Sequence, residues 1–136
     1  MKDDTAMNGL QMKYCHKANW NAQLYQLSWG GNWGGWTMMH MCPKGKFIYS
    51  MNARVENRMG LGDDTAMNGL MMACRYANGA YPQAFMVHPG YYGFWRGWSQ
   101  VLAGYHVCGT ATRYENPGQA DDTAFNGLSL KMCTWA

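Results

Sequence analysis

Apolar and polar positions alternate along several short stretches of the chain. From Phe47 to Glu56, one column of alternate positions is mostly apolar and the other is mostly polar. The same period of two residues runs through residues 10–14 and 128–132. Because successive side chains of a strand point to opposite faces of a sheet, this pattern predicts half-buried β-strands.

A helical period is missing from the sequence. No window shows sustained apolar spacing of 3.6 residues. Gly, Pro and Asn instead interrupt the chain roughly every eight to twelve residues, which favours a sandwich, barrel or prism of short strands. We therefore expect an all-β fold in one domain, since 136 residues are too few for two independent cores.

An octet of residues occurs three times, at 3–10, 63–70 and 121–128, with one Met replaced by Phe in the third copy. Each copy leads into a cysteine, and these cysteines are Cys15, Cys74 and Cys133. Repetition of this length predicts a fold built from similar units.

Two further elements each occur twice. Trp33–Trp36 corresponds to Trp95–Trp98, and residues 53–57 correspond to residues 112–116. We therefore divide the domain, residues 1–136, into a partial repeat followed by two complete repeats. Their bounds are 1–15, 16–74 and 75–133.

The polar part of each octet predicts a tight turn. Asp and Thr side chains bond to nearby backbone groups, and Asn-Gly accepts positive φ at low cost. We expect the octet to hold a sharp polar loop before the strand that ends in cysteine. The structural turn residues are Asp3, Asp4, Asn8, Asp63, Asp64, Asn68, Asp121, Asp122 and Asn126. Calcium binding is the alternative, but the octet lacks the oxygen-ligand spacing of a known calcium loop.

Residues 33–74 resemble the vitelline membrane outer layer protein family. The family pattern is Trp-Gly-x-Trp, Cys-Pro-x-Gly-x-Phe, a strand ending in Arg-Val-Glu, Gly-Asp-Asp-Thr-Ala-x-Asn-Gly, and a strand ending in Cys. The segment matches all of it. The next repeat keeps the Trp pair, the Arg-x-Glu element and the octet, but Val101 and Leu102 replace the Cys-Pro pair.

The resemblance implies a β-prism of three antiparallel Greek-key sheets around a pseudo-threefold axis, one sheet per repeat. It also implies a secreted protein of egg coats or other extracellular layers, with no catalytic residues to carry over. Because the N-terminal repeat is incomplete, its sheet would keep unpaired strand edges. Residues 16–32, an upstream segment or a neighbouring copy could supply the missing strands, and the last would build an oligomer or filament.

The resemblance also implies the disulfide pairing. The Cys before Pro-x-Gly pairs with the Cys that closes the same module, which here means Cys42 with Cys74. Cys108 then pairs with Cys133, and Cys15 is left over for a bond to another chain. Five free thiols in a cytosolic protein are the alternative, but repeated modules closed by cysteine favour an oxidising, extracellular compartment.

Composition and charge narrow the choice of partners. Lys and Arg number 11 in a chain of net charge +3, and their closest grouping is Lys44 with Lys46, so we expect no nucleic-acid partner. No apolar run approaches the roughly 18 residues of a membrane span, so we expect no membrane partner either. The first ten residues lack the apolar region of a signal peptide, so we expect a mature chain (or else a cytosolic one).

Aromatic residues are 15% of the chain and gather beside glycines. Trp and Tyr flanked by glycine can stack on sugar rings. The glycan-binding candidates are Trp29, Trp33, Trp36, Tyr91, Tyr92, Trp95 and Trp98. The alternative is that the repeated Trp pairs fill the axis of the prism, and their repetition in register with the scaffold favours it. Trp29, Tyr91 and Tyr92 lie outside the pairs and are the better ligand candidates.

Metal and catalytic motifs are weak. Residues 38–42 contain soft ligands for Cu(I), but consecutive strand residues point to opposite faces, which favours methionine as core filler. The four His have no zinc-ligand spacing. Glu56 and Glu115 end equivalent strands on separate sheets, too far apart for the carboxylate pair of a glycosidase. We therefore expect no metal, no cofactor and no catalysis.

The sequence thus predicts a secreted, self-associating structural protein of an extracellular coat, matrix or fibre. A secreted carbohydrate-binding module of the same fold is the alternative, with glycans or glycoproteins as partners. A carbohydrate-active enzyme is a weaker third hypothesis.

Overall fold

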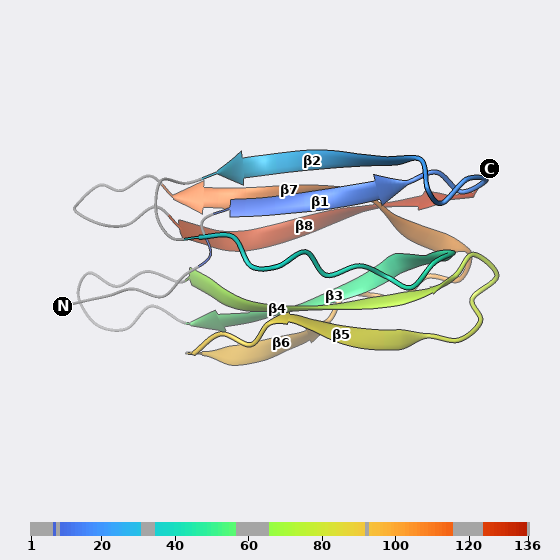
Figure 1. The fold of residues 1–136 in the computed structure, drawn as a ribbon. Helices are drawn as coiled ribbons and strands as arrows, with labels where there is room; N and C mark the ends of the chain where they lie inside the picture. The colour runs from blue at the N-terminus through green and yellow to red at the C-terminus, as the bar shows by residue number, and fades with distance from the viewer. Residues whose placement is uncertain are drawn as a thin grey trace, which may run out of the picture.

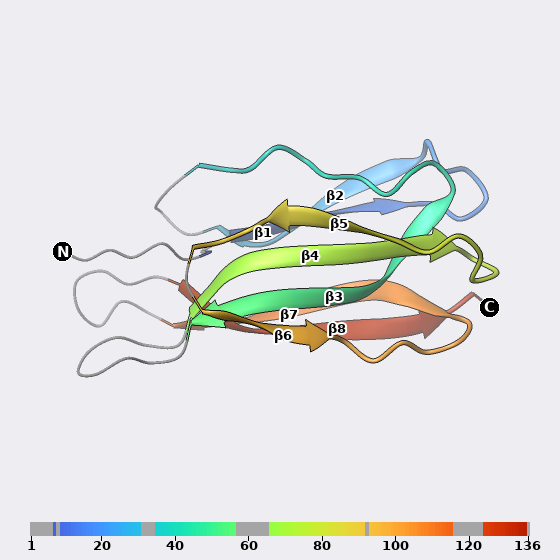
Figure 2. The same cartoon turned by 90° about the horizontal axis from the view of Figure 1, so that it is seen from below.

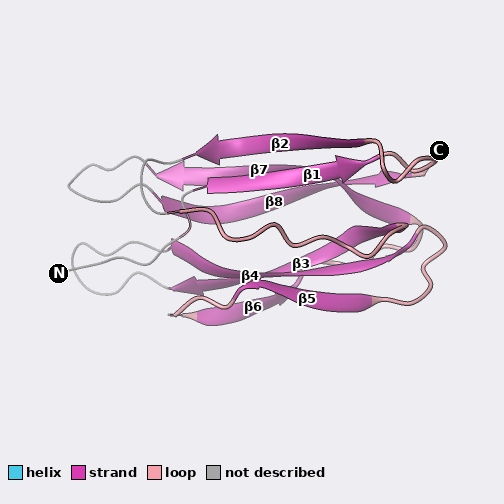
Figure 3. Ribbon diagram, in the orientation of Figure 1, coloured by secondary structure: helices cyan, strands magenta, loops and turns pink. Residues whose placement is uncertain are grey.

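The computed structural model describes residues 7, 9–30, 35–56, 66–91, 93–115 and 124–135, and for residues 25–30, 66, 114–115 and 124–126 it describes the backbone alone. This part of the chain forms eight β-strands and no helix, which confirms the all-β prediction (Figures 1 and 3). The strands are β1 (Gly9–Cys15), β2 (Gln23–Gly30), β3 (Lys46–Glu56), β4 (Ala66–Tyr76), β5 (Gln83–His88), β6 (Phe94–Trp98), β7 (Tyr105–Glu115) and β8 (Ala124–Thr134). Among these residues no helix is long and apolar enough to cross a membrane.

The described strands form three antiparallel sheets. Two of them have two strands each, β1–β2 and β7–β8, and the third has the order β5–β4–β3–β6. In the four-stranded sheet, β6 returns to lie beside β3, which is the spatial order of a Greek key. Figure 1 shows β1–β2 and β7–β8 on the same side of the four-stranded sheet, and Figure 2 shows β1–β2 toward its β5 edge and β7–β8 toward its β6 edge.

The two long hairpins, β3–β4 and β7–β8, repeat each other. All four strands have 11 residues. Both ladders shift register at the same two places of the repeat, once just before Ser50 or Gly109 and once just after Arg54 or Arg113. The repetition seen in the sequence is therefore also present in the hydrogen-bond register.

The second hairpin differs by one residue before its closing cysteine. As a result, Cys74 lies opposite Ile48, whereas Cys133 lies opposite His106 rather than Val107, the counterpart of Ile48. A shift of one position moves a strand side chain to the other face of the sheet. The two closing cysteines therefore occupy different faces relative to their partner strands.

The strands of the smaller sheets correspond to different halves of the larger one. β1, β4 and β8 each carry the end of one octet, lead into a cysteine and run in the same direction (Figure 1). β2 follows β1 as β5 follows β4, while β7 precedes β8 as β3 precedes β4. The sheet β1–β2 thus corresponds to the β4–β5 half, and the sheet β7–β8 corresponds to the β3–β4 half.

The core is rich in methionine. Four of its buried members are Met12, Met51, Met67 and Met72, each at most 8% exposed, and they pack with Leu10, Val55, Leu70 and Cys74. Flexible thioether side chains fill irregular gaps between sheets well. The expectation of core filler fails for Met38 and Met39, which are 74% and 39% exposed in a segment, residues 35–43, that forms no strand.

The last residues of the octet lie in strands, not in a turn. Asn68 and Gly69 belong to β4, and Asn126 belongs to β8, so the prediction of a turn is wrong at these positions. Asn68 is 2% exposed, and its Oδ1 accepts a hydrogen bond from the Tyr91 N–H at 3.1 Å. The Asn68 amide therefore makes a tertiary contact with a distant loop instead of a local contact within a turn. The remaining turn predictions, Asp3, Asp4, Asn8, Asp63, Asp64, Asp121 and Asp122, lie outside the described residues.

Candidate functional site

A cavity of about 870 Å³ lies between the sheets. Its wall is formed by β1, by residues 35–42, by parts of β3, β4, β5 and β7, and by single residues from the loops. The volume falls within the range of small-molecule sites. We therefore treat this cavity as the candidate functional site.

The described lining is apolar and aromatic, with basic groups but no Asp or Glu. The aromatic residues are Tyr14, Trp20, Trp36, Phe47, Tyr91 and Trp135, and the histidines and lysines are His40, His88, His106, Lys13 and Lys46. Acid–base hydrolysis of a glycoside needs two carboxyl groups across one cleft. The described wall offers aromatic and apolar surfaces for stacking and contact, with basic groups beside them.

Trp135 closes one side of the cavity by contacting all three sheets or their loops. Its ring stacks on His106 of β7 at 3.7 Å between centroids and meets Phe47 of β3 edge-on at 4.8 Å. Lys17, from the loop after β1, lies with its Nζ 5.1 Å from the same ring. Phe47 and His106 are equivalent positions of the two hairpins, so one indole side chain joins both repeats.

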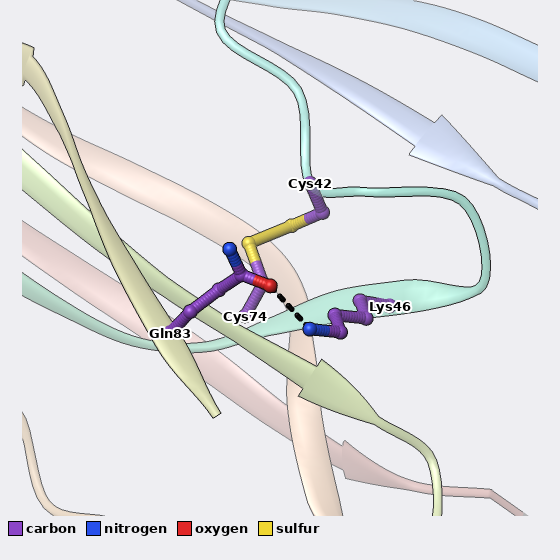
Figure 4. The surroundings of a disulfide bond; sticks show 4 residues. All are labelled: Cys42, Lys46, Cys74 and Gln83. Atoms are coloured by element: carbon purple, nitrogen blue, oxygen red, sulfur yellow. Dashed lines mark hydrogen bonds between the residues drawn. A yellow bond between two sulfur atoms is a disulfide. The ribbon is translucent and has the colours of Figure 1, made fainter. Parts of the chain in front are cut away.

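Lys46 is a buried cation in the wall, with only 8% of its side chain exposed. Its Nζ donates a hydrogen bond to Gln83 Oε1 and lies 5.2 Å from the Tyr76 ring centroid. Figure 4 shows this pair beside the Cys42–Cys74 disulfide. Amide and aromatic partners, rather than a carboxylate, therefore compensate the burial of this ammonium group.

Three lining residues each have a buried ring nitrogen without a hydrogen-bond partner among the described residues, namely Trp20 Nε1, His40 Nδ1 and His106 Nδ1. Burial lowers the pKa of His106, the nearby Lys17 lowers it further, and a backbone hydrogen bond with Cys133 opposes both. The imidazole therefore stays neutral to a lower pH than an exposed histidine does.

Both implied disulfides are present in the structure. Cys42 bonds to Cys74 and Cys108 bonds to Cys133, with the Cα atoms 5.8 Å apart in each pair. Cys15 is a free, half-buried thiol in the cavity wall, and burial raises its pKa against the opposing effect of Lys13. A bond from Cys15 to another chain stays a prediction.

The structure brings together two of the glycan-binding candidates, Trp36 and Tyr91, which line the cavity and are 59% and 65% exposed. Trp95 and Trp98 lie on β6, outside the lining. The backbone of Trp29, in β2, pairs with that of Leu10 in β1, but the Trp29 side chain is not described. Trp33 and Tyr92 lie outside the described residues.

The position of Tyr91 is set by residues of two sequence motifs. The Arg54 side chain, from the Arg-Val-Glu element, donates to the carbonyl oxygens of Pro89 at 3.1 Å, Gly90 at 3.4 Å and Gly93 at 3.2 Å. Asn68, from the octet, accepts from the Tyr91 N–H. These motifs therefore act on the loop between β5 and β6, a role that sequence reasoning missed.

Sequence reasoning also missed Trp20, Trp135 and the histidines of the wall. None of them has a glycine neighbour or belongs to a repeated motif, so no local signal separates them from other aromatic residues. No group of three or more His, Cys, Asp or Glu in the described part of the chain is placed to hold a metal ion.

Comparisons with known proteins agree on one family. The family model described as vitelline membrane outer layer protein I matches residues 1–135. The human (Homo sapiens) vitelline membrane outer layer protein 1 homolog is 32% identical over 133 residues, which are 96% of this chain and 62% of the human protein. The mouse (Mus musculus) protein of the same name is 35% identical over 82 residues, 60% of this chain and 40% of the mouse protein. The chain thus spans less than two thirds of the length of either relative.

Proposed function

Because this chain belongs to the vitelline membrane outer layer protein I family, we propose that it is a secreted structural protein of an extracellular coat, matrix or fibre. It acts without catalysis, by associating with copies of itself. The names of its relatives refer to an outer layer of the vitelline membrane, which is an extracellular coat. Its two disulfides support an oxidising compartment.

The proposed fold is a β-prism of three Greek-key sheets with pseudo-threefold symmetry. The Greek-key order of the four-stranded sheet and the matching bulges of the two hairpins support it. So does the hydrogen bond from the Met7 N–H to the Met67 carbonyl oxygen, 2.8 Å long, because these residues hold equivalent positions in two octets.

Unpaired strand edges are the observation that carries the assembly proposal. Among the described strands, none is hydrogen-bonded to the outer edges of β7 and β8, and none to the edge of β1 that faces away from β2. In the four-stranded sheet the edges equivalent to those of β7 and β8 are covered by β6 and β5. An uncovered edge presents free N–H and C=O groups to another chain.

Sedimentation velocity at rising protein concentration tests the proposal. We expect oligomers or filaments whose population grows with concentration, and elongated particles in electron micrographs of the same samples. The Cys15→Ser variant is the control that separates strand association from disulfide cross-linking, and it should assemble like the unmodified chain. A monomer at every concentration contradicts the proposal.

Carbohydrate binding is the second candidate function, favoured by Trp36 and Tyr91 in one cavity wall. Titration with chitin oligosaccharides, followed by tryptophan fluorescence, should then saturate. Trp36→Ala and Tyr91→Ala should each weaken binding at least about tenfold, in line with the loss of one aromatic stacking contact. Tyr81→Ala is the matched control, because Tyr81 is 74% exposed and lies outside the cavity lining.

A further inference from the structure

The edge of β3 shows how this fold holds an added strand. The Ser99 N–H, directly after β6, donates to the Met51 carbonyl oxygen at 2.9 Å, and the Met51 N–H donates to Ser99 Oγ at 3.1 Å. The Gly97 N–H donates to Asn52 Oδ1 at 2.9 Å. Two of these three contacts use only the backbone of β3, so they do not depend on its side chains.

β7 offers the same backbone edge without an added strand. Thr110 is the counterpart of Met51, 59 residues later, and the bulges on both sides of it match those around Met51. Matching bulges orient the N–H and C=O of Thr110 outward, as they do for Met51. Among the described strands, β7 is hydrogen-bonded to β8 alone.

The chain also carries a second copy of the β6 sequence. Gly35, Trp36 and Thr37 repeat Gly97, Trp98 and Ser99, and the hydroxyl group that bonds to β3 is kept as that of Thr37. These three residues are exposed and form no strand. Thr37 Oγ1 donates to the neighbouring Met38 carbonyl oxygen, at 3.1 Å.

The segment that follows is unusually apolar for a surface. Trp36, Met38 and Met39 are 59%, 74% and 39% exposed. Contiguous exposed apolar side chains mark interaction sites on soluble proteins. We define residues 35–39 as the donor segment and the outer edge of β7 at Thr110 as the acceptor edge.

We propose that the donor segment of one copy adds to the acceptor edge of a second copy, as β6 adds to β3. Thr37 then takes the place of Ser99, with its N–H donating to the Thr110 carbonyl oxygen and its hydroxyl accepting from the Thr110 N–H. The inference rests on the proposed self-association and names its two surfaces. Because donor and acceptor are different surfaces, the contact is head-to-tail and extends into a ring or a filament.

A second copy is the occupant because the donor segment of the same chain is already placed elsewhere. Gly35, Trp36 and Thr37 line the cavity together with β1, and no ladder joins them to β7. Gly109 and Ala111 stand where β3 has Ser50 and Asn52, whose side chains bond to Ser99 and Gly97, so these side-chain contacts to the added strand are absent on β7. The remaining contacts are backbone-mediated, as in other cases of strand addition.

Proline substitutions test the two surfaces separately. Thr37→Pro removes the donor N–H and hydroxyl from an exposed residue outside any strand, and Thr110→Pro removes the acceptor N–H from the outer side of an edge strand, where proline is tolerated. Each variant should raise the concentration needed for assembly at least about tenfold in sedimentation velocity, the equivalent of one to two hydrogen bonds. Thr37→Ser and Thr110→Ser keep these groups and should assemble normally.

Mixing the two proline variants gives the decisive measurement. The Thr37→Pro chain keeps a working acceptor and the Thr110→Pro chain keeps a working donor, so together they should form a one-to-one dimer that does not grow. Unchanged assembly of Thr37→Pro, or a mixture of folded variants that stays monomeric, overturns the inference. If circular dichroism shows that Thr110→Pro is unfolded, Trp36→Ala against Leu24→Ala replaces it, since Leu24 is also an exposed apolar residue but lies outside the donor segment.

The controls also separate this inference from the proposed function. If the unmodified chain is monomeric throughout, both fail. If it assembles and neither proline variant changes its assembly, self-association stands and only the assignment of the surfaces fails.

Discussion

The β3–β4 and β7–β8 hairpins have the same length and the same bulges, but they differ in their surroundings. β3–β4 is flanked by β5 and β6, and there Cys74 is 0% exposed and Arg54 binds three carbonyl oxygens. In β7–β8, Cys133 is half-buried and Arg113 is exposed. The repeat therefore encodes the hairpin locally, while the flanking strands determine how much each residue contributes to stability.

The largest expected effect comes from removing a disulfide. Cys42→Ala with Cys74→Ala opens a loop of 32 residues, and Cys108→Ala with Cys133→Ala opens one of 25, so chain entropy costs each variant about 3–4 kcal/mol. The first variant should lose about 1 kcal/mol more, because Cys74 is fully buried and leaves a cavity. Urea denaturation of both variants measures the difference, and a larger loss in the second hairpin would contradict the comparison.

Next in size is the effect of filling a glycine position in β4. A Cβ on Gly69 would lie 2.7 Å from the Pro89 carbonyl oxygen and 2.9 Å from Arg54 Cβ, so Gly69→Ala should cost about 2 kcal/mol. At the equivalent position, the atom nearest to the new Cβ of Gly127→Ala is Arg113 Cβ at 3.2 Å, so a shift of a few tenths of an ångström relieves the contact and the cost should be less than about 1 kcal/mol. Thermal denaturation of the two variants measures whether Gly69→Ala destabilises the fold more than Gly127→Ala does.

Substitution of the two equivalent arginines should also destabilise the β3–β4 hairpin more than the β7–β8 hairpin, but by a smaller difference. Arg54→Ala removes the hydrogen bonds that hold residues 89–93 and should destabilise the fold by about 1.5–3 kcal/mol. Arg113→Ala should stay within about 0.5 kcal/mol, as expected for an exposed side chain. Arg54→Lys keeps the charge but not the fork of donors, and an unchanged stability in that variant would show that geometry is unimportant here.

The smallest expected effect is on the pH dependence of stability, and it concerns His106 and Phe47, the two residues whose rings contact Trp135. Because the pKa of His106 in the fold lies below its ordinary value of 6.5, the unfolded chain binds the proton more readily, and stability falls as pH drops through that value. His106→Gln should therefore flatten the decrease in stability between pH 7 and pH 5, while Phe47, its counterpart in β3, does not titrate. His16→Gln, at an exposed histidine, is the control.

Several strands could be predicted because their signal is local. The two-residue period from Phe47 to Glu56 falls in β3, and the octets lead into β1, β4 and β8. The cysteine pairs followed from the resemblance rather than from spacing. The sequence of the closing repeat also indicated the extra residue before Cys133, whose effect on register the structure then shows.

The features that were predicted wrongly or not at all depend on contacts between distant segments. Asn-Gly at positions 68–69 is typical of a turn in isolation, but in the fold Gly69 pairs with Arg54 of β3 and Asn68 accepts a hydrogen bond from the Tyr91 N–H. Methionine was expected to fill the core at residues 38–42, but Met38 and Met39 are exposed, and among the described strands none is paired with this segment. Trp20 and Trp135 reach the cavity through chain topology, which no window of sequence contains.

Near-identical repeats carry a hazard during oxidative folding, because β3 could associate with β8 instead of β4. The additional residue in β8 disfavours this wrong pairing, because it shifts Cys133 by one position in the register. In such a mismatched hairpin, Cys133 would lie opposite Phe47 instead of Ile48 and would point away from Cys42. A bond between Cys42 and Cys133 is then disfavoured, so oxidation of Cys42 favours the pairing of β3 with β4.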